Sequence, residues 1–164
     1  MLYFKLLGME INLNCDLGEK SKHHSNENDP ELLKIVNSAN VACGYHAGDE
    51  QTMQEVVKIS KENNVSIGAH PSFKDPENFG RKRMDLSASE ITKLVTDQYE
   101  ILQNIASLQG EKVSHIKPHG ALNNMACEDL ELATTLAKTI YHIDKDIIYF
   151  CLLYTSPSPR DLWI

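Results

Sequence analysis

The sequence predicts a parallel α/β fold, and two observations lead to this prediction. Short apolar segments typical of strands alternate along the chain with longer amphipathic segments typical of helices. Each of the first four predicted strands is also followed closely by polar, chemically reactive residues. Neighbouring parallel strands need a crossover connection, which a helix usually provides. An open doubly wound sheet and a (β/α) barrel both satisfy this pattern, and periodicity does not separate them.

The first two strand–helix units have clear boundary signals. Residues 11–15 alternate between apolar and polar side chains, as in a half-buried strand, and a polar loop follows them. Asp29 and Pro30 then supply an N-cap and a first-turn proline for a short helix. Residues 39–43 form the second predicted strand, and Asp49 can cap the helix that comes after it.

The third unit begins with the apolar segment 65–69 and continues through a long loop. Ser87 and Glu90 then match the S-x-x-E pattern of a capping box, which predicts the start of a helix. Apolar residues recur with helical spacing from there until Gly110, where we expect the helix to end.

The last predicted elements are a strand, a helix and the beginning of another strand. Residues 113–117 form the fourth strand, which Pro118 ends. A helix is expected roughly over residues 128–140, and residues 146–150 start a fifth strand. The chain is therefore expected to contain four strand–helix units and the start of a fifth strand.

The composition favours a soluble globular protein over one that binds nucleic acid or membranes. Of the 164 residues, 41% are hydrophobic, and a net charge of −7 would repel nucleic acid and anionic lipid. The apolar segments are too short to span a bilayer. The cysteines at positions 15, 43, 127 and 151 form no C-x-x-C pair, which favours reduced thiols and a cytoplasmic location.

Eight reactive residues lie at or just after the ends of the first four predicted strands, two at each. They are Asp16 and Glu19, His46 and Asp49, His70 and Asp75, and Lys117 and His119. Because the carboxyl ends of parallel strands open on one face, we expect these side chains to gather at a single mouth. Four of them suit both a divalent metal and acid–base catalysis on an amide: Asp16, His46, His70 and His119. The alternative is a local role, since Asp49 is an obvious N-cap and a histidine after a strand often bonds to loop backbone.

A cationic segment and the lack of nucleotide-binding motifs give weaker indications of the ligand and of the type of sheet. Arg81 lies beside Gly80 in the sequence F-G-R-K-R at 79–83, where a guanidinium group can bind a carboxylate or phosphate. A solvated basic turn is the alternative. Neither G-x-G-x-x-G nor a Walker A sequence occurs, so the two common nucleotide signatures do not support the open sheet.

Five short segments contain most of these reactive residues. They are N-C-D-L-G-E (14–19), S-A-N-V-A-C-G-Y-H-A-G-D (38–49), G-A-H-P (68–71), F-G-R (79–81) and K-P-H-G-A-L (117–122). In this order they resemble the LamB/YcsF family, whose members are A subunits of bacterial 5-oxoprolinase. The resemblance implies an incomplete (β/α) barrel of the deacetylase-like type. It also implies a role in the ATP-dependent opening of 5-oxo-L-proline to L-glutamate, with ATP and Mg²⁺, in a complex with 5-oxoprolinase subunits B and C.

The resemblance further implies roles for individual residues. The catalytic candidates that match the family's segments are Asp16, His46, His70 and His119. The substrate-binding candidates are Glu19, Asp49, Asp75, Arg81 and Lys117. By analogy with metal-dependent deacetylases on similar barrels, a divalent metal would be held by Asp16, His46 and His70. Two alternatives to a catalytic oxoprolinase chain remain open: a metal-dependent carbohydrate deacetylase, and a non-catalytic subunit that positions the substrate.

The length of the chain bears on its domain organisation. A (β/α) barrel needs about 250 residues, so we expect residues 9–150 to be the N-terminal part of one barrel domain, inactive by itself. Residues 1–8 are expected to be a non-native leader, because Met9 is a better start. Residues 151–164 are expected to be a non-native tail, because they are similar to the translation of an adapter used in sequencing libraries. Their Ser-Pro-Ser-Pro sequence also neither continues a strand nor begins a helix.

Overall fold

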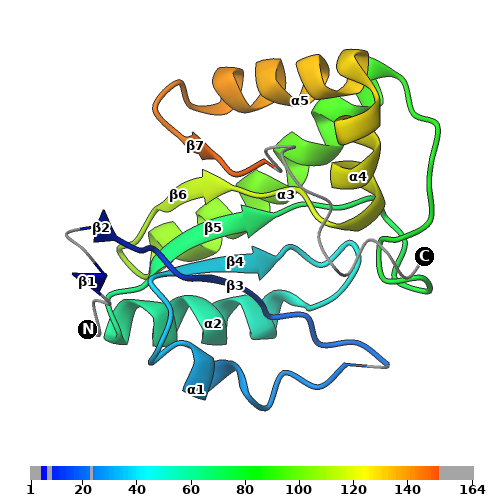
Figure 1. Cartoon of the computed structure of the whole chain (residues 1–164). Coiled ribbons are helices and arrows are strands. Elements are labelled where there is room, and N and C mark those ends of the chain that lie inside the picture. Colours follow the sequence, from blue (N-terminus) through cyan, green and yellow to red (C-terminus); the bar gives the residue numbers. More distant parts are fainter. Residues whose placement is uncertain (1–4, 7–8, 23, 152–164) are drawn as a thin grey trace.

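The computed structural model describes residues 5–6, 9–22 and 24–151, and it has a parallel sheet at its centre (Figure 1). Five strands follow one another across this sheet: β3 (Asn14–Leu17), β4 (Ser38–Ala42), β5 (Ser66–His70), β6 (Val113–Ile116) and β7 (Ile148–Tyr149). The predicted parallel α/β fold is therefore confirmed. A doubly wound sheet reverses its strand order part-way, whereas these strands keep the order of the chain, as consecutive strands of a (β/α) barrel do.

Helices connect the strands of this sheet (Figure 1). They are α1 (Asp29–Leu32), α2 (Glu50–Glu62), α3 (Ala88–Leu108), α4 (Gly120–Glu128) and α5 (Leu130–Ile143). Helix α2 packs against β4 and β5, and α3 packs against β5 and β6. Helix α5 packs on α3. Helices α2 and α3 therefore each cover the pair of strands that they join.

The two faces of the sheet differ in chemistry, because side chains alternate along each strand. Val41 of β4 and Ala69 of β5 are fully buried in the apolar core together with Val57 of α2. Asn40 lies between the core residues of β4, so its side chain points to the opposite face, where it meets polar side chains of β3 and β6. The helix-covered face stabilises the fold, and the opposite face carries the polar groups.

Two helix starts confirm the boundaries predicted from the sequence. Asp49 caps α2, since its carboxylate accepts a hydrogen bond from the backbone N–H of Thr52 at 2.8 Å. Ser87 and Glu90 form the predicted capping box at the start of α3. Both signals are local, which explains why the sequence alone identifies them.

Other boundaries differ from the expectation. The first strand of the sheet begins at Asn14, three residues later than predicted. The N-cap of α1 is Asn28 and not Asp29, because the Asp29 carboxylate instead accepts a hydrogen bond from the backbone N–H of Gly18 at 2.7 Å. Helix α4 was not predicted, since its start at Gly120 carries no side-chain cap.

A short antiparallel ribbon precedes the sheet and was also not predicted. Its strands are β1 (Lys5–Leu6) and β2 (Met9–Glu10). The rest of the expected leader, at 1–4 and 7–8, and positions 152–164 of the expected tail lie outside the described residues. Within the described part of the chain, none of the helices combines the length and the apolar character needed to cross a membrane.

Candidate active site

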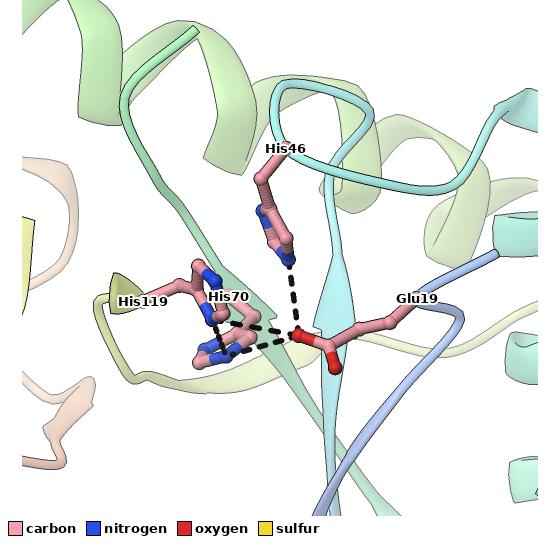
Figure 2. A group of neighbouring side chains, drawn as sticks. All are labelled: Glu19, His46, His70 and His119. Carbon is pink, nitrogen blue, oxygen red and sulfur yellow. Dashed lines mark hydrogen bonds and ion pairs between the residues drawn. The ribbon is translucent and has the colours of Figure 1, made fainter. Parts of the chain in front are cut away.

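Four strand-to-helix connections bring one glutamate and three histidines together, and we call these four residues the histidine cluster (Figure 2). Glu19 follows β3, and His46 lies in the loop after β4. His70 is the last residue of β5, and His119 follows β6 as the N-cap of α4. The three histidines are at most 8% exposed. The side chains at the carboxyl ends of these neighbouring parallel strands therefore lie together, as the strand order predicts.

One oxygen of Glu19 contacts all three histidine rings. Glu19 Oε1 lies 3.1 Å from Nε2 of His46, 3.7 Å from Nε2 of His70 and 3.4 Å from Nδ1 of His119. His70 Nε2 and His119 Nδ1 are 3.0 Å apart. The ligand-type atoms of the four residues all lie within 4.8 Å of one another.

Backbone carbonyl groups hold the outer nitrogens of two of these histidines. His70 Nδ1 lies 2.5 Å from the carbonyl oxygen of Lys117, and His119 Nε2 lies 2.9 Å from that of Phe79. Phe79 has a φ of 56°, a left-handed conformation that is rare for an aromatic residue. Such strain persists where the surroundings fix it, often at functional sites. Here it accompanies a carbonyl group that orients a cluster histidine.

His46 is held by a hydroxyl group and by ring stacking. Its Nδ1 lies 2.9 Å from Oγ of Ser72, whose hydroxyl donates to the carbonyl oxygen of Phe73 at 2.9 Å. The ring stacks on that of His119 with 3.9 Å between the centroids. Gly80 approaches the rings so closely, at a φ of +67°, that a Cβ atom there would lie 2.9 Å from Cβ of His46.

Burial affects the protonation of two of the cluster histidines, His46 and His119. It lowers the pKa of His46, and burial together with the charges of His46 and His70 lowers the pKa of His119 to about 3. Both rings are therefore neutral near pH 7. A neutral imidazole has a lone pair on one nitrogen, which makes it a ligand for a transition metal or an acceptor for a proton.

Asp16 and Lys117 form a charged pair beside the cluster. Lys117 Nζ donates to Asp16 Oδ1 at 2.5 Å, and the Asn40 amide donates to the same oxygen at 2.8 Å. The other oxygen, Oδ2, lies 3.5 Å from Nε2 of His70. Burial alone would raise the pKa of Asp16, but its contacts with His70 and Lys117 hold that pKa well below its usual range. The carboxylate is therefore ionised and can accept a hydrogen bond from a water or a substrate.

A second polar group lies on the sheet itself, and we call it the inner-face network: Asn14, Asp16, Asn40 and His115. The Asn40 amide donates to Asn14 Oδ1 at 2.9 Å and to Asp16 Oδ1 at 2.8 Å. Because its nitrogen is used in this way, its Oδ1 accepts the hydrogen bond from Nε2 of His115, which is 3.0 Å away. Gly68 makes room for His115, since a Cβ atom at Gly68 would lie 2.1 Å from the ring.

The remaining predicted site residues have local contacts. Asp49 caps α2. The Asp75 carboxylate accepts a hydrogen bond from the backbone N–H of Lys82 at 3.1 Å, within its own loop. The Arg81 guanidinium lies 5.4 Å from the centroid of the Phe79 ring. The structure therefore gives these three residues contacts that stabilise the loops around the site.

The set of residues that can hold a metal differs from the one that the deacetylase analogy implies. Glu19 stands at the centre, where that analogy put Asp16, since Glu19 Oε1 contacts all three rings whereas Asp16 Oδ2 lies 3.5 Å from Nε2 of His70. His119 completes the group.

The sequence patterns also missed four supporting residues: Asn40, Ser72, Phe79 and His115. Asn40 and His115 are polar residues inside predicted strands, and this was the one signal that could have revealed them. Ser72 and Phe79 lie in a long loop whose path no local pattern determines.

The comparison with protein families decides where the chain belongs. The profile of the LamB/YcsF family matches residues 11–158. The chain belongs to the LamB/YcsF family. The resemblance found in the five sequence segments is thereby confirmed.

Two proteins that are similar to this chain carry the same name. The chain is 44% identical over 140 residues to the 5-oxoprolinase A subunit of Staphylococcus carnosus (strain TM300), covering 85% of this chain and 56% of the relative. It is 43% identical over 147 residues to the protein of the same name from Staphylococcus epidermidis (strain RP62A), covering 90% of this chain and 58% of the relative.

A solved structure shows the same fold. The lactam utilization protein from Thermus thermophilus matches with a TM-score of 0.84 and 37% identity, over 90% of this chain and 60% of that chain. The chain thus spans somewhat more than half the length of the proteins it matches.

Proposed function

We propose that this chain acts in the cytoplasm as the A-type subunit of an ATP-dependent 5-oxoprolinase. In this role it hydrolyses the lactam of 5-oxo-L-proline to L-glutamate, with cleavage of ATP to ADP and phosphate. Subunits B and C are its partners, and ATP with Mg²⁺ is the co-substrate. The observation that carries the proposal is the 43–44% identity to proteins named as the A subunits of 5-oxoprolinase.

The chemistry of the lactam explains why ATP is needed. A five-membered lactam is an unactivated amide, so its carbonyl carbon reacts slowly with water. Transfer of the γ-phosphoryl group of ATP to the lactam oxygen makes that carbon electrophilic. One water then adds to the carbon, the C–N bond breaks to free the amine, and an acyl phosphate remains. A second water releases phosphate from it and leaves the side-chain carboxylate of glutamate.

The charged pair beside the cluster supports this reaction. Asp16 is ionised and can orient the attacking water through a hydrogen bond, and the cluster histidines lie beside it. The ammonium group of Lys117 can stabilise negative charge that develops on the oxygen of the lactam. We therefore propose Asp16 and the histidine cluster as the catalytic centre, with Lys117 as a substrate contact.

The test is glutamate formation from 5-oxoproline by the full-length protein mixed with its partner subunits and ATP. Wild type should form glutamate only when ATP is present. Asp16→Asn should lower kcat by at least about 100-fold, since a positioned charge in a closed site typically contributes that much. Asp97→Asn is the matched control, because Asp97 also pairs with a lysine, Lys93, on the surface of α3. Absence of glutamate with the wild-type mixture would refute the proposal.

A metal-dependent deacetylase is a second candidate, and the histidine cluster favours it. Three histidines and a carboxylate at the mouth of an α/β fold suit a metal-activated water. Release of acetate from an acetylated sugar without ATP would support this candidate over the lactam reaction. A subunit that only positions substrate is distinguished by full turnover of the complex with Asp16→Asn.

A further inference from the structure

We infer that the histidine cluster binds one divalent transition-metal cation such as Zn²⁺ through four atoms: Glu19 Oε1, His46 Nε2, His70 Nε2 and His119 Nδ1. The inference adds a bound metal to the proposed catalytic centre. It does not require the proposed reaction, because metal binding can be measured without turnover.

The first step of the argument concerns which ring nitrogens carry hydrogen. A neutral imidazole has one N–H group, and a backbone carbonyl oxygen can only accept. The carbonyl of Lys117 therefore requires a hydrogen on Nδ1 of His70, and the carbonyl of Phe79 places the one hydrogen of the neutral His119 ring on Nε2. His119 Nδ1 consequently presents a lone pair to His70 Nε2, which is 3.0 Å away.

The same reasoning applies to His46 through a hydroxyl group. The single hydroxyl hydrogen of Ser72 is donated to the carbonyl oxygen of Phe73. Ser72 Oγ therefore accepts from Nδ1–H of His46, and Nε2 of this ring carries a lone pair. That lone pair faces the carboxylate oxygen of Glu19 at 3.1 Å.

The second step follows from these assignments. The Glu19 carboxylate oxygen and the lone pairs of His46 and His119 converge with His70 Nε2, and these four ligand-type atoms lie within 4.8 Å of one another. Such an arrangement is unfavourable in a buried site unless a cation lies among the lone pairs. Metal-binding histidines in proteins usually donate their outer N–H to a carbonyl, a carboxylate or a water, which fixes the ring for the metal. The outer nitrogens here are bonded in that way.

Four of the six distances among the ligand-type atoms agree with the size of such a cation, and all six are within 4.8 Å. Ligand atoms about 2.1 Å from a tetrahedral Zn²⁺ lie about 3.4 Å from one another. The distances among the four atoms that the dashed lines of Figure 2 join range from 3.0 Å to 3.7 Å. Three imidazoles favour Zn²⁺ over Mg²⁺ or Ca²⁺, which prefer oxygen ligands. When bound, a Zn²⁺ ion would supply a Lewis acid beside Asp16.

The experiment is calorimetric titration of the chelator-treated chain with ZnCl₂ and, separately, MgCl₂. Wild type should bind one Zn²⁺ per chain and should not bind Mg²⁺ at this site. His70→Asn and His119→Gln should each weaken Zn²⁺ binding by at least about 100-fold, because a ligand is lost. Ser72→Ala should weaken it by about 10–100-fold, since it only frees the outer nitrogen of His46. His142→Gln, at an exposed histidine of α5, is the control and should bind like wild type.

Two results would overturn the inference. One is a folded wild-type chain, as judged by circular dichroism, that binds no Zn²⁺. The other is equal Zn²⁺ binding by wild type, His70→Asn and His119→Gln. A melting curve gives a second measurement that tolerates weakened variants: Zn²⁺ should raise the Tm of wild type and of His142→Gln but not of the ligand variants.

The two proposals can fail separately. Stoichiometric Zn²⁺ binding without glutamate formation in the complex would remove the proposed function and keep the metal site. Glutamate formation by a chain that binds no Zn²⁺ would remove the metal site and keep the proposed function.

Discussion

The inner-face network and the histidine cluster are neighbouring polar groups with opposite hydrogen-bond arrangements. In the network, the amide of Asn40 donates to two oxygens and its carbonyl accepts from His115, so each contact joins a donor to an acceptor. In the cluster, a carboxylate oxygen and the lone pairs of His46 and His119 face one another beside His70. Asp16 is adjacent to both groups, since Oδ1 belongs to the network and Oδ2 lies near His70.

This difference separates a supporting group from a binding group. A buried network in which donors and acceptors match is stable without any ligand and fixes the side chains that it includes. A buried group of acceptors gains stability when something positive joins it. The network therefore positions Asp16, and the cluster is the part that responds to a ligand. The following variants test this distinction.

Glu19→Gln should have the largest effect, and it acts on the cluster alone. The amide nitrogen of glutamine can donate a hydrogen bond to a neighbouring histidine, so the metal-free chain should keep or raise its Tm. Zn²⁺ affinity should fall by at least about 100-fold, because a charged ligand is replaced by a neutral donor. Titration calorimetry and melting curves measure both effects. Glu77→Gln, at an exposed glutamate paired with Lys22, is the control.

Asn40→Ala should have the largest effect on stability. Asn40 is fully buried, and its removal takes away one hydrogen bond from each of His115, Asn14 and Asp16. We expect the free energy of unfolding to fall by about 2–4 kcal/mol, measured by urea unfolding. Asn104→Ala, on the exposed side of α3, should change it by less than about 0.5 kcal/mol. A loss no greater than that of the control would mean that the network does not stabilise the fold.

Acidification should destabilise the network through His115. Burial lowers the pKa of this ring from 6.5 to about 4 in the folded chain. Between these values the unfolded chain binds a proton that the folded chain does not, so stability falls as the pH decreases. The loss attributable to His115 between pH 7 and pH 5 should be about 2 kcal/mol. His115→Gln removes the titrating group, so a variant with undiminished pH dependence would contradict this assignment.

Asp49→Ala should have the smallest effect. The substitution removes the cap of α2 and should cost about 1 kcal/mol in the free energy of unfolding. Zn²⁺ affinity should stay within about twofold of wild type, because the carboxylate contacts Thr52 and not the cluster. Weaker Zn²⁺ binding at unchanged stability would instead place Asp49 in the site.

The sequence by itself determined the strand–helix alternation of the parallel sheet and the end of the sheet at which the reactive residues meet, although it missed α4 and the β1–β2 ribbon. Strand and helix periodicity, the Asp49 cap and the Ser87–Glu90 capping box are local patterns, and local interactions form them in the structure as well. The placement of His46, His70 and His119 at one mouth followed from parallel strand order alone. Membership of the LamB/YcsF family could likewise be inferred from five short segments.

Only the tertiary structure decided how these side chains contact one another. The central position of Glu19 in the cluster depends on the path of the loop after β3, and the network of Asn40 and His115 depends on strand register. The outer hydrogen bonds of the rings come from Ser72 and Phe79, which lie far from their partners in the sequence. Hydrogen bonding depends on tenths of an ångström between residues distant along the chain, and such distances are set by packing and not by local pattern.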